Sequence, residues 1–253
     1  MKWGRIEIEG HAVDVRVHGE EVVAHGGRRF PLAGAKLLPP VVPANFYAAG
    51  LNFRAHIDWA NGHLGTSYKA PTQADIGYRS TNALVASGAE IVIPADSTGP
   101  VEYEGELVAV IGKRARNLSE SDALDCVAGY TLGNDVSERT WQKSDRTLWR
   151  AKNADTFKPM GPFIVDGLDP MDQTIEVRIN GRTVSSYHTS GMIFGVAHYL
   201  ARMSRYMTLH PGDVVWFGCD GPTIPALQPG DLVEVVNDAI GVLANRVVGE
   251  GTP

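Results

Sequence analysis

Two glutamates, Glu104 and Glu106, are separated by a single residue. They directly precede an apolar segment, residues 107–111, that is typical of a buried strand. Side chains alternate between the two faces of a strand, so this spacing directs both carboxylates into the same volume. Like charges tolerate each other there in water, with a shared proton, or around a cation. Glu102 has the same parity, and a solvated strand edge with charged ends is the alternative interpretation.

Three other polar residues could complete a site around this pair. Asp135 follows a strand predicted at 130–132, at the point where the strand meets a polar loop. Lys152 lies in a segment whose proline and glycine content favours a fixed, non-helical path. His56 lies near the start of the polar stretch 54–78, which lacks sustained periodicity and is predicted to be irregular. Two Glu and one Asp, without His or Cys, suit a hard cation such as Mg²⁺ or Mn²⁺.

Short strands dominate the elements that must hold these residues, and helices are few, which indicates an α+β fold that is mainly β. Alternating runs followed by turn signals predict hairpins within a small N-terminal β region, 1–43, and a proline-rich segment joins it to a catalytic domain, 44–253. Further strands are predicted at 163–165, 174–179, 213–217 and 231–236, an amphipathic helix at 194–207, and helical starts at 81–86 and 119–127. No βαβ cadence, GxGxxG or P-loop is present, which disfavours nucleotide-binding folds.

Composition excludes several classes of partner. The net charge is −6 and the basic residues are scattered, so nucleic acid is not an expected partner. No apolar run approaches the roughly 18 residues of a membrane span, and we expect a soluble cytoplasmic protein without a membrane partner. Cys126 and Cys219 lie too far apart for a CxxC motif and do not form a disulfide framework, so both are expected to be free thiols.

Several separated motifs occur in an order that resembles the fumarylacetoacetate hydrolase family over roughly residues 45 to 236. The resemblance implies a mixed β-roll or β-sandwich core, a homodimer, and one Mg²⁺ or Mn²⁺ in each site. It also implies a small-molecule substrate that carries a 2-oxo acid or 1,3-dicarbonyl unit. The motifs are Gly50-Leu-Asn-Phe53 with His56, Tyr103-Glu-Gly-Glu-Leu107, Asn134-Asp-Val-Ser-Glu-Arg-Thr140, Asp155-Thr-Phe157 after Lys152, and Ser190-Gly-Met-Ile-Phe194.

Carried over residue by residue, the resemblance assigns roles to the polar residues. The three acids would bind the metal, Lys152 would stand beside it as the partner of a substrate oxygen, and His56 would be a catalytic base. Without the resemblance, Arg139, Gln142 and Thr189 would be a surface charge, a surface amide and a turn residue. The implied metal ligands are Glu104, Glu106 and Asp135, and the implied substrate-binding residues are Arg139, Gln142 and Thr189.

The chain departs from the family pattern beside His56. Family hydrolases commonly carry an acid three residues after this histidine, and here that residue is Trp59. Asp58, two residues after His56, would point to another side of a helical turn, although it could serve as the catalytic partner in an irregular loop. Asp75 is another candidate. The pairing of His56 with an acid therefore depends on how this segment folds.

A second departure is Cys219-Asp220, where family members often carry a hydroxyl residue and no acid. If this segment borders the pocket, Asp220 would disfavour a second substrate carboxylate and favour a neutral substrate tail. It could equally be an acid in a surface turn.

The first functional hypothesis is a metal-dependent hydrolase that cleaves a C–C bond in a 2,4-dioxo acid or other β-dicarbonyl, in the breakdown of ring-opened aromatic compounds. Such a reaction needs a stabilised enolate and a base that delivers water. The alternative is a decarboxylase, tautomerase or hydratase of a 2-oxo acid on the same metal site. A non-catalytic relative is disfavoured, because the predicted ligands and Lys152 are all present.

Overall fold

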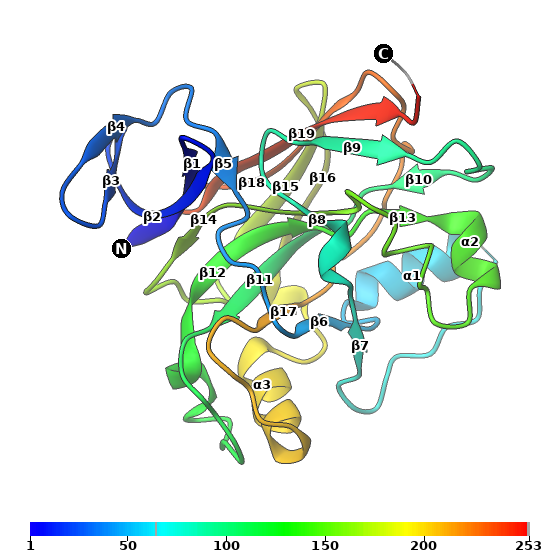
Figure 1. Ribbon diagram of the computed structural model, residues 1–253. Helices are drawn as coiled ribbons and strands as arrows, with labels where there is room; N and C mark the ends of the chain where they lie inside the picture. The colour runs from blue at the N-terminus through cyan, green and yellow to red at the C-terminus, as the bar shows by residue number, and fades with distance from the viewer. Residues whose placement is uncertain (64, 252–253) are drawn as a thin grey trace.

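The computed structural model describes residues 1–63 and 65–251, and it is mainly β with few helices (Figure 1). The predicted α+β, mainly β class is thereby confirmed. The largest sheet has twelve strands within the described residues. They are β1 (Lys2–Ile8), β2 (His11–His18), β3 (Glu21–Ala24), β4 (Arg29–Pro31), β5 (Leu37–Leu38), β6 (Phe46–Ala49), β7 (Ile76–Tyr78), β8 (Leu84–Val85), β11 (Gly105–Ile111), β12 (Val127–Asn134), β14 (Lys158–Val165) and β17 (Val214–Trp216).

Two smaller sheets and a few helices make up the other regular elements of the described residues. The second sheet contains β9 (Glu90–Ile93), β15 (Thr174–Ile179), β16 (Arg182–His188), β18 (Leu232–Asn237) and β19 (Gly241–Gly249), and a short pair joins β10 (Val101–Glu102) to β13 (Ser137–Glu138). The helices are α1 (Arg54–His63), α2 (Arg139–Ser144) and α3 (Val196–Tyr206), with single 3₁₀ turns η1 (Thr81–Ala83), η2 (Ala123–Cys126) and η3 (Thr189–Gly191).

The N-terminal strands extend the large sheet. Its strand order is β4-β3-β2-β1-β14-β12-β11-β17-β6-β7, and β1 joins the rest through an antiparallel pair with β14. Strands β1 to β5 also enclose a small core of their own around Ile6, Val15 and Val22. The division of the chain at residue 43 therefore stays a prediction, because hydrogen bonding is continuous across it while the small core is separate.

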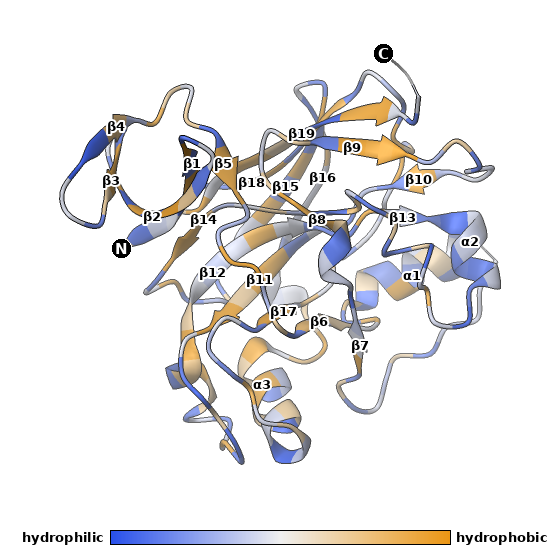
Figure 2. Ribbon diagram, in the orientation of Figure 1, coloured by the Kyte–Doolittle hydropathy of each residue, from blue (hydrophilic) through white to orange (hydrophobic). Residues whose placement is uncertain are grey.

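Strand β11 is buried along its whole length and lies between two hydrophobic cores. On one face Leu107 belongs to the main core, which includes residues of the second sheet and of α3. On the other face Val108 packs in a second cluster with Trp216 and Met160. Figure 2 shows the apolar residues concentrated along the central strands. The strand that carries Glu106 is thus held from both sides.

The predicted helices were partly correct. The amphipathic helix predicted at 194–207 is confirmed as α3. The stretch 54–78 was predicted to be irregular, and this was wrong at both of its ends. Its first part forms α1, which buries only Ile57 and Ala60, and its last residues form β7. A helix that buries two side chains leaves almost no periodic apolar signal in the sequence. The helical starts predicted at 81–86 and 119–127 form only the short 3₁₀ turns η1 and η2.

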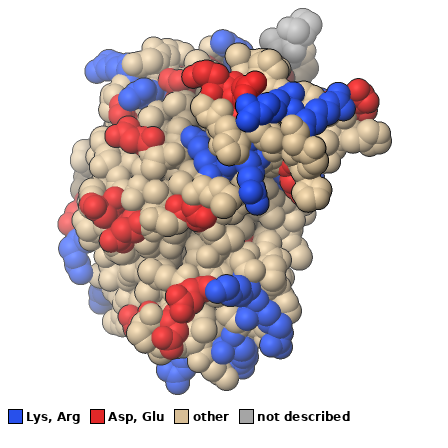
Figure 3. All heavy atoms as spheres, turned by 90° about the vertical axis from the view of Figure 1, so that its left-hand side faces the viewer, with Lys and Arg blue, Asp and Glu red and all other residues tan. Residues whose placement is uncertain are grey.

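Two further features concern the charges on one face of the molecule and the length of the helices. On the face that carries the N-terminal strands, acidic and basic side chains are interspersed (Figure 3). None of the helices in the described part of the chain is long and apolar enough to cross a membrane.

Gly105, at the start of β11, allows the two large sheets to approach each other. A Cβ atom built on this residue would lie 2.6 Å from Val177 on β15 and 3.1 Å from Val235 on β18. Both valines are 2% exposed or less, so neither can move into solvent. The close contact of the sheets beside the acidic pair thus requires glycine at this position.

We predict that Gly105→Ala destabilises the protein by about 1 to 3 kcal/mol, because the added methyl group overpacks the contact between the sheets. The free energy of unfolding, measured by urea denaturation, tests this. Gly62→Ala is the matched control. Gly62 lies in α1, and a Cβ atom added to it would have no neighbour within 4 Å, so alanine there should be neutral or stabilising by up to about 1 kcal/mol. Equal stabilities for the two variants would contradict the prediction.

Candidate active site

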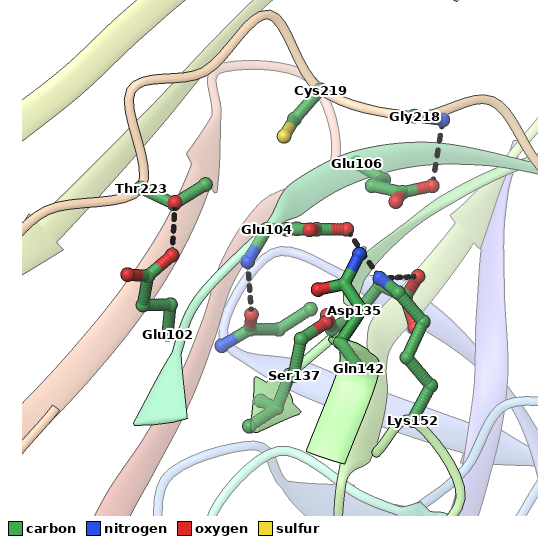
Figure 4. Close-up of polar contacts among 12 residues, drawn as sticks. Glu102, Glu104, Glu106, Asp135, Ser137, Gln142, Lys152, Gly218, Cys219 and Thr223 are labelled. Atoms are coloured by element: carbon green, nitrogen blue, oxygen red, sulfur yellow. Dashed lines mark hydrogen bonds and ion pairs between the residues drawn. The ribbon is translucent and has the colours of Figure 1, made fainter. Parts of the chain in front are cut away.

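Three buried carboxylates meet where β11 and β12 pair. Glu104 directly precedes β11, Glu106 lies in it, and Asp135 directly follows β12. The antiparallel register places Gly105 opposite Asn134, and the Asp135 N–H donates to the Glu104 carbonyl at 2.8 Å. One carboxylate oxygen from each acid lies within 4.8 Å of the others. Figure 4 shows the three side chains converging.

These carboxylates have opposite ionisation behaviour. Burial alone would raise all three pKa values, but Lys152 and Arg139 outweigh it at Glu104 and lower its pKa to about 2. Cations likewise hold the pKa of Asp135 well below its usual range. Burial and the neighbouring carboxylates raise the pKa of Glu106 to about 8, and its Oε2 accepts the Gly218 N–H at 2.7 Å. The group offers three carboxylates within 4.8 Å of one another and no nitrogen or sulfur donor, and such a donor set fits a hard divalent cation.

Cations surround Asp135 on several sides. The Lys152 ammonium donates at 2.8 Å both to Asp135 and to Glu104. Arg79 binds both oxygens of Asp135, at 3.0 and 2.7 Å, and Lys158, which is fully buried, contacts one of them at 2.8 Å. Sequence reasoning identified Lys152 and missed Arg79 and Lys158. A lysine in the apolar strand β14 was the available signal, because a fully buried lysine needs a partner.

Arg139, at the start of α2, is held by acids of the site. Its guanidinium donates to Glu102 at 2.6 Å and to Gln142 at 2.7 Å, and it pairs with Glu104 at 2.8 Å. Glu102 also accepts from the Thr223 hydroxyl and is not part of the three-acid group. Figure 4 shows Glu102 turned toward Thr223, away from Asp135. Both predicted substrate-binding residues on α2, Arg139 and Gln142, thus lie beside the carboxylates.

His56 lies on α1 and faces the segment after β17. Its Nδ1 is 3.2 Å from the Cys219 carbonyl oxygen and 3.7 Å from the Cys219 sulfur. A carbonyl oxygen can only accept, so we assign the proton to Nδ1, which leaves Nε2 as an acceptor without a partner among the described residues. Burial, the largest effect, lowers the pKa of His56 and favours the neutral ring. His56 therefore has the state of a base that is ready to accept a proton.

Neither candidate acid reaches His56 in the described part of the chain. Asp58 is exposed on α1, and Asp75 accepts the N–H of the next residue, Ile76. The orienting partner of His56 is the Cys219 carbonyl. Asp58 lies outside the cavity lining, as does Thr189, which is fully buried and accepts from the Gln173 N–H at 3.0 Å.

A cavity of about 530 Å³ opens above the carboxylates. The three acids, Lys152, His56, Arg139 and Gln142 line it, together with an apolar wall of Trp59, Tyr68 and Leu148. A larger concavity, of about 790 Å³, lies against the N-terminal strands, but none of the predicted site residues lines it. The cavity above the acids is therefore the candidate active site.

Known proteins resemble this chain in sequence and in fold. The sequence model described as fumarylacetoacetate (FAA) hydrolase C-terminal matches residues 45–248. The solved structure of 5-carboxymethyl-2-hydroxymuconate delta-isomerase from Mycobacterium smegmatis is 33% identical, covers 100% of both chains, and has a TM-score of 0.88. Oxaloacetate tautomerase YisK of Bacillus subtilis is 30% identical over 95% of this chain and 87% of its own. A 2,4-didehydro-3-deoxy-L-rhamnonate hydrolase of Sphingomonas sp. is 35% identical over 79% of this chain and 72% of its own.

We predict that Asp135→Asn lowers the affinity for Mn²⁺ at least about a hundredfold, because the amide removes one anionic oxygen donor from the group. Isothermal titration of the protein with MnCl₂ measures this, with circular dichroism as a check on folding. Glu102→Gln is the control, since Glu102 is buried nearby but outside the three-acid group, and it should retain binding within a few-fold. Mn²⁺ binding by Asp135→Asn at unchanged affinity would remove Asp135 from the ligand set.

We also predict that the affinity for Mn²⁺ increases with pH. In the metal-free protein Glu106 has a pKa of about 8, so below that pH a cation must displace its proton. The apparent affinity should therefore rise by up to about tenfold per pH unit between about pH 6 and 8, and level off above 8. Mn²⁺ titrations across this range measure the slope. A constant affinity would mean that no ligand loses a proton on binding.

Proposed function

Because the chain belongs to the fumarylacetoacetate hydrolase family, we propose that it is a divalent-metal-dependent enzyme that transfers a proton next to the carbonyl group of a 2-oxo acid, as a tautomerase or isomerase. The relatives with these activities in their names, an oxaloacetate tautomerase and a muconate delta-isomerase, support this choice. The proposal includes Mg²⁺ or Mn²⁺ as the metal and a homodimer as the assembly.

The observation that carries the proposal is the state of His56. His56 borders the cavity, and burial lowers the pKa of its ring, which favours the neutral form, although the charge of Glu104 opposes this effect. Its Nδ1 faces the Cys219 carbonyl, and no carboxylate of the described residues hydrogen-bonds to the ring. Tautomerisation needs one such group, which takes a proton from the carbon beside the carbonyl and returns it to the oxygen. Hydrolysis would also require this base to activate and aim a water molecule.

The other residues of the cavity support the same chemistry. A divalent cation held by Glu104, Glu106 and Asp135 would stabilise negative charge that develops on the substrate oxygens. Lys152 can donate a hydrogen bond to one of these oxygens, because its ammonium lies at the base of the cavity between two of the acids. Trp59 and Leu148 line the same cavity, and their apolar side chains would exclude water from the part of the substrate that they cover.

C–C bond hydrolysis of a 2,4-dioxo acid or other β-dicarbonyl is the second candidate. The similarity to a rhamnonate hydrolase favours it, and so does a cavity of about 530 Å³, which has room for an acyl group beside the apolar wall. His56 would then act as the base that activates water, without the help of an acid. The two candidates share the metal site and differ in what His56 deprotonates.

We predict that His56→Ala lowers the rate of proton exchange at carbon 3 of a 2-oxo acid by about 10² to 10⁴, the usual contribution of a general base. Proton NMR of oxaloacetate or 2-oxobutyrate in D₂O measures this exchange, with protein that is loaded with Mg²⁺ and contains no Mn²⁺. Asp58→Asn is the matched control on the same helix and should leave the rate unchanged, because Asp58 is exposed and outside the cavity. A similar loss in both variants would contradict the assignment.

The two candidate reactions differ in whether an oxygen atom from water enters the product. We predict that an acylpyruvate incubated with the Mg²⁺-loaded protein in H₂¹⁸O is tautomerised without cleavage and yields no ¹⁸O-labelled carboxylic acid fragment. Mass spectrometry of the products measures this, and a mixture without protein is the control. Rapid formation of two fragments with ¹⁸O in one of them would favour the hydrolase.

A further inference from the structure

The basic side chains of the cavity differ in whether the protein already neutralises them. Within the described residues, Arg79, Arg139, Lys143 and Lys152 line the cavity. Arg79 is fixed by both oxygens of Asp135 and by a backbone carbonyl. Lys152 is shared between Glu104 and Asp135. These two cations are therefore already ion-paired with the three-acid group.

Arg139 is already ion-paired as well. Its three nitrogens contact Glu102, Glu104, Gln142 and Thr223, at 2.6 to 3.1 Å. Turning this guanidinium toward a substrate would leave buried carboxylates without a counter-charge, which is costly. Arg139 can therefore border the substrate, but it is poorly placed to bind a second carboxylate at the far end.

Lys143 is the exception among these four. It lies on α2 four residues after Arg139, which places both side chains on the same face of the helix, one turn apart. Its side chain is exposed at the cavity lining and makes no ion pair or hydrogen bond with any residue that the structure describes. Lys143 is thus an exposed cation, unpaired among the described residues, that lines the same cavity as Trp59 and Leu148.

We propose that Lys143 is a specificity-determining residue that pairs with an anionic group at the far end of the substrate, so that the enzyme prefers 2-oxo diacids to 2-oxo acids with a neutral tail. This inference rests on the proposed function, in which the 2-oxo acid end is held beside the three acids. One helical turn is about 5.4 Å, so a tail of a few carbons spans the step from Arg139 to Lys143.

The loop after β17 does not oppose this preference. The sequence favoured a neutral tail if Asp220 bordered the pocket, but Asp220 is not among the residues that line the cavity, whereas Cys219 is. The Asp220 side chain is partly buried, and its Oδ1 has no hydrogen-bond partner among the described residues. Methylene groups of a diacid can lie against Trp59 and Leu148 while the terminal carboxylate meets the ammonium group of Lys143.

The test compares two ligands of equal chain length, 2-oxoglutarate and 2-oxovalerate, which differ in whether the far end is a carboxylate or a methyl group. Their affinities for the full-length, Mn²⁺-loaded protein are measured by isothermal titration, with oxalate as a probe of the 2-oxo acid end alone. We expect 2-oxoglutarate to bind roughly fivefold more tightly than 2-oxovalerate, the effect of one partly exposed ion pair, and the ratio to fall with added NaCl.

Variants locate the source of this preference. Lys143→Gln should abolish it and Lys143→Glu should reverse it, while oxalate and 2-oxovalerate bind as before. Arg146→Gln is the matched control, because Arg146 is an exposed cation just after α2 that does not line the cavity, and it should keep the preference. A purely structural role of Lys143 at the end of α2 would change the melting temperature and leave the ligand ratio unchanged.

Two results would overturn the inference, and they are distinguishable. If oxalate binds and Lys143→Gln keeps the full preference for 2-oxoglutarate, Lys143 does not bind the far end, and the proposed function survives. If neither oxalate nor either 2-oxo acid binds to the Mn²⁺-loaded protein, the proposed function fails and the inference fails with it.

Discussion

Burial of three carboxylates in one small volume is the constraint on which the rest of this structure depends. Glu104, Glu106 and Asp135 are each at most 7% exposed, and unpaired charges at such a depth would cost several kcal/mol each. The chain meets this cost in two ways. Lys152 and its neighbouring cations keep Glu104 and Asp135 ionised, while Glu106 retains its proton to about pH 8 in the absence of a metal.

The three carboxylates stay close together only if the surrounding backbone is held rigidly enough to resist the repulsion between them. Strand β11 meets that need because both of its faces are packed, and its pairing with β12 places Asp135 beside Glu104 through a backbone hydrogen bond. The tight contact at Gly105 brings the second sheet against the same strand. A site built on strand ends between two cores is more rigid than one built on loops, which suits the proposed metal site.

The sequence predicted the parts of this site that depend on local spacing. The shared face of Glu104 and Glu106 required only alternation along a strand. The position of Asp135 required only a predicted strand, 130–132, that ends at a polar loop. Arg79 and Lys158 were missed because their role arises from contacts with a residue far along the chain. Helix α1 was missed because it buries too little apolar surface to show a period. The family resemblance supplied roles for Arg139 and Lys152. It did not predict the ion pairs that these two side chains form with Glu102, Glu104 and Asp135.

The carboxylate cluster cannot by itself select a reaction, because enolate stabilisation serves isomerisation, tautomerisation and hydrolysis alike. In the proposed function, the choice of reaction would depend on a separate contact, between α1 and the segment after β17. There the Cys219 carbonyl orients His56, and Gly221 lies so close that a Cβ atom on it would be 3.3 Å from the imidazole ring. In this proposal, a substitution in either segment would change the orientation of His56 and leave the three carboxylates in place.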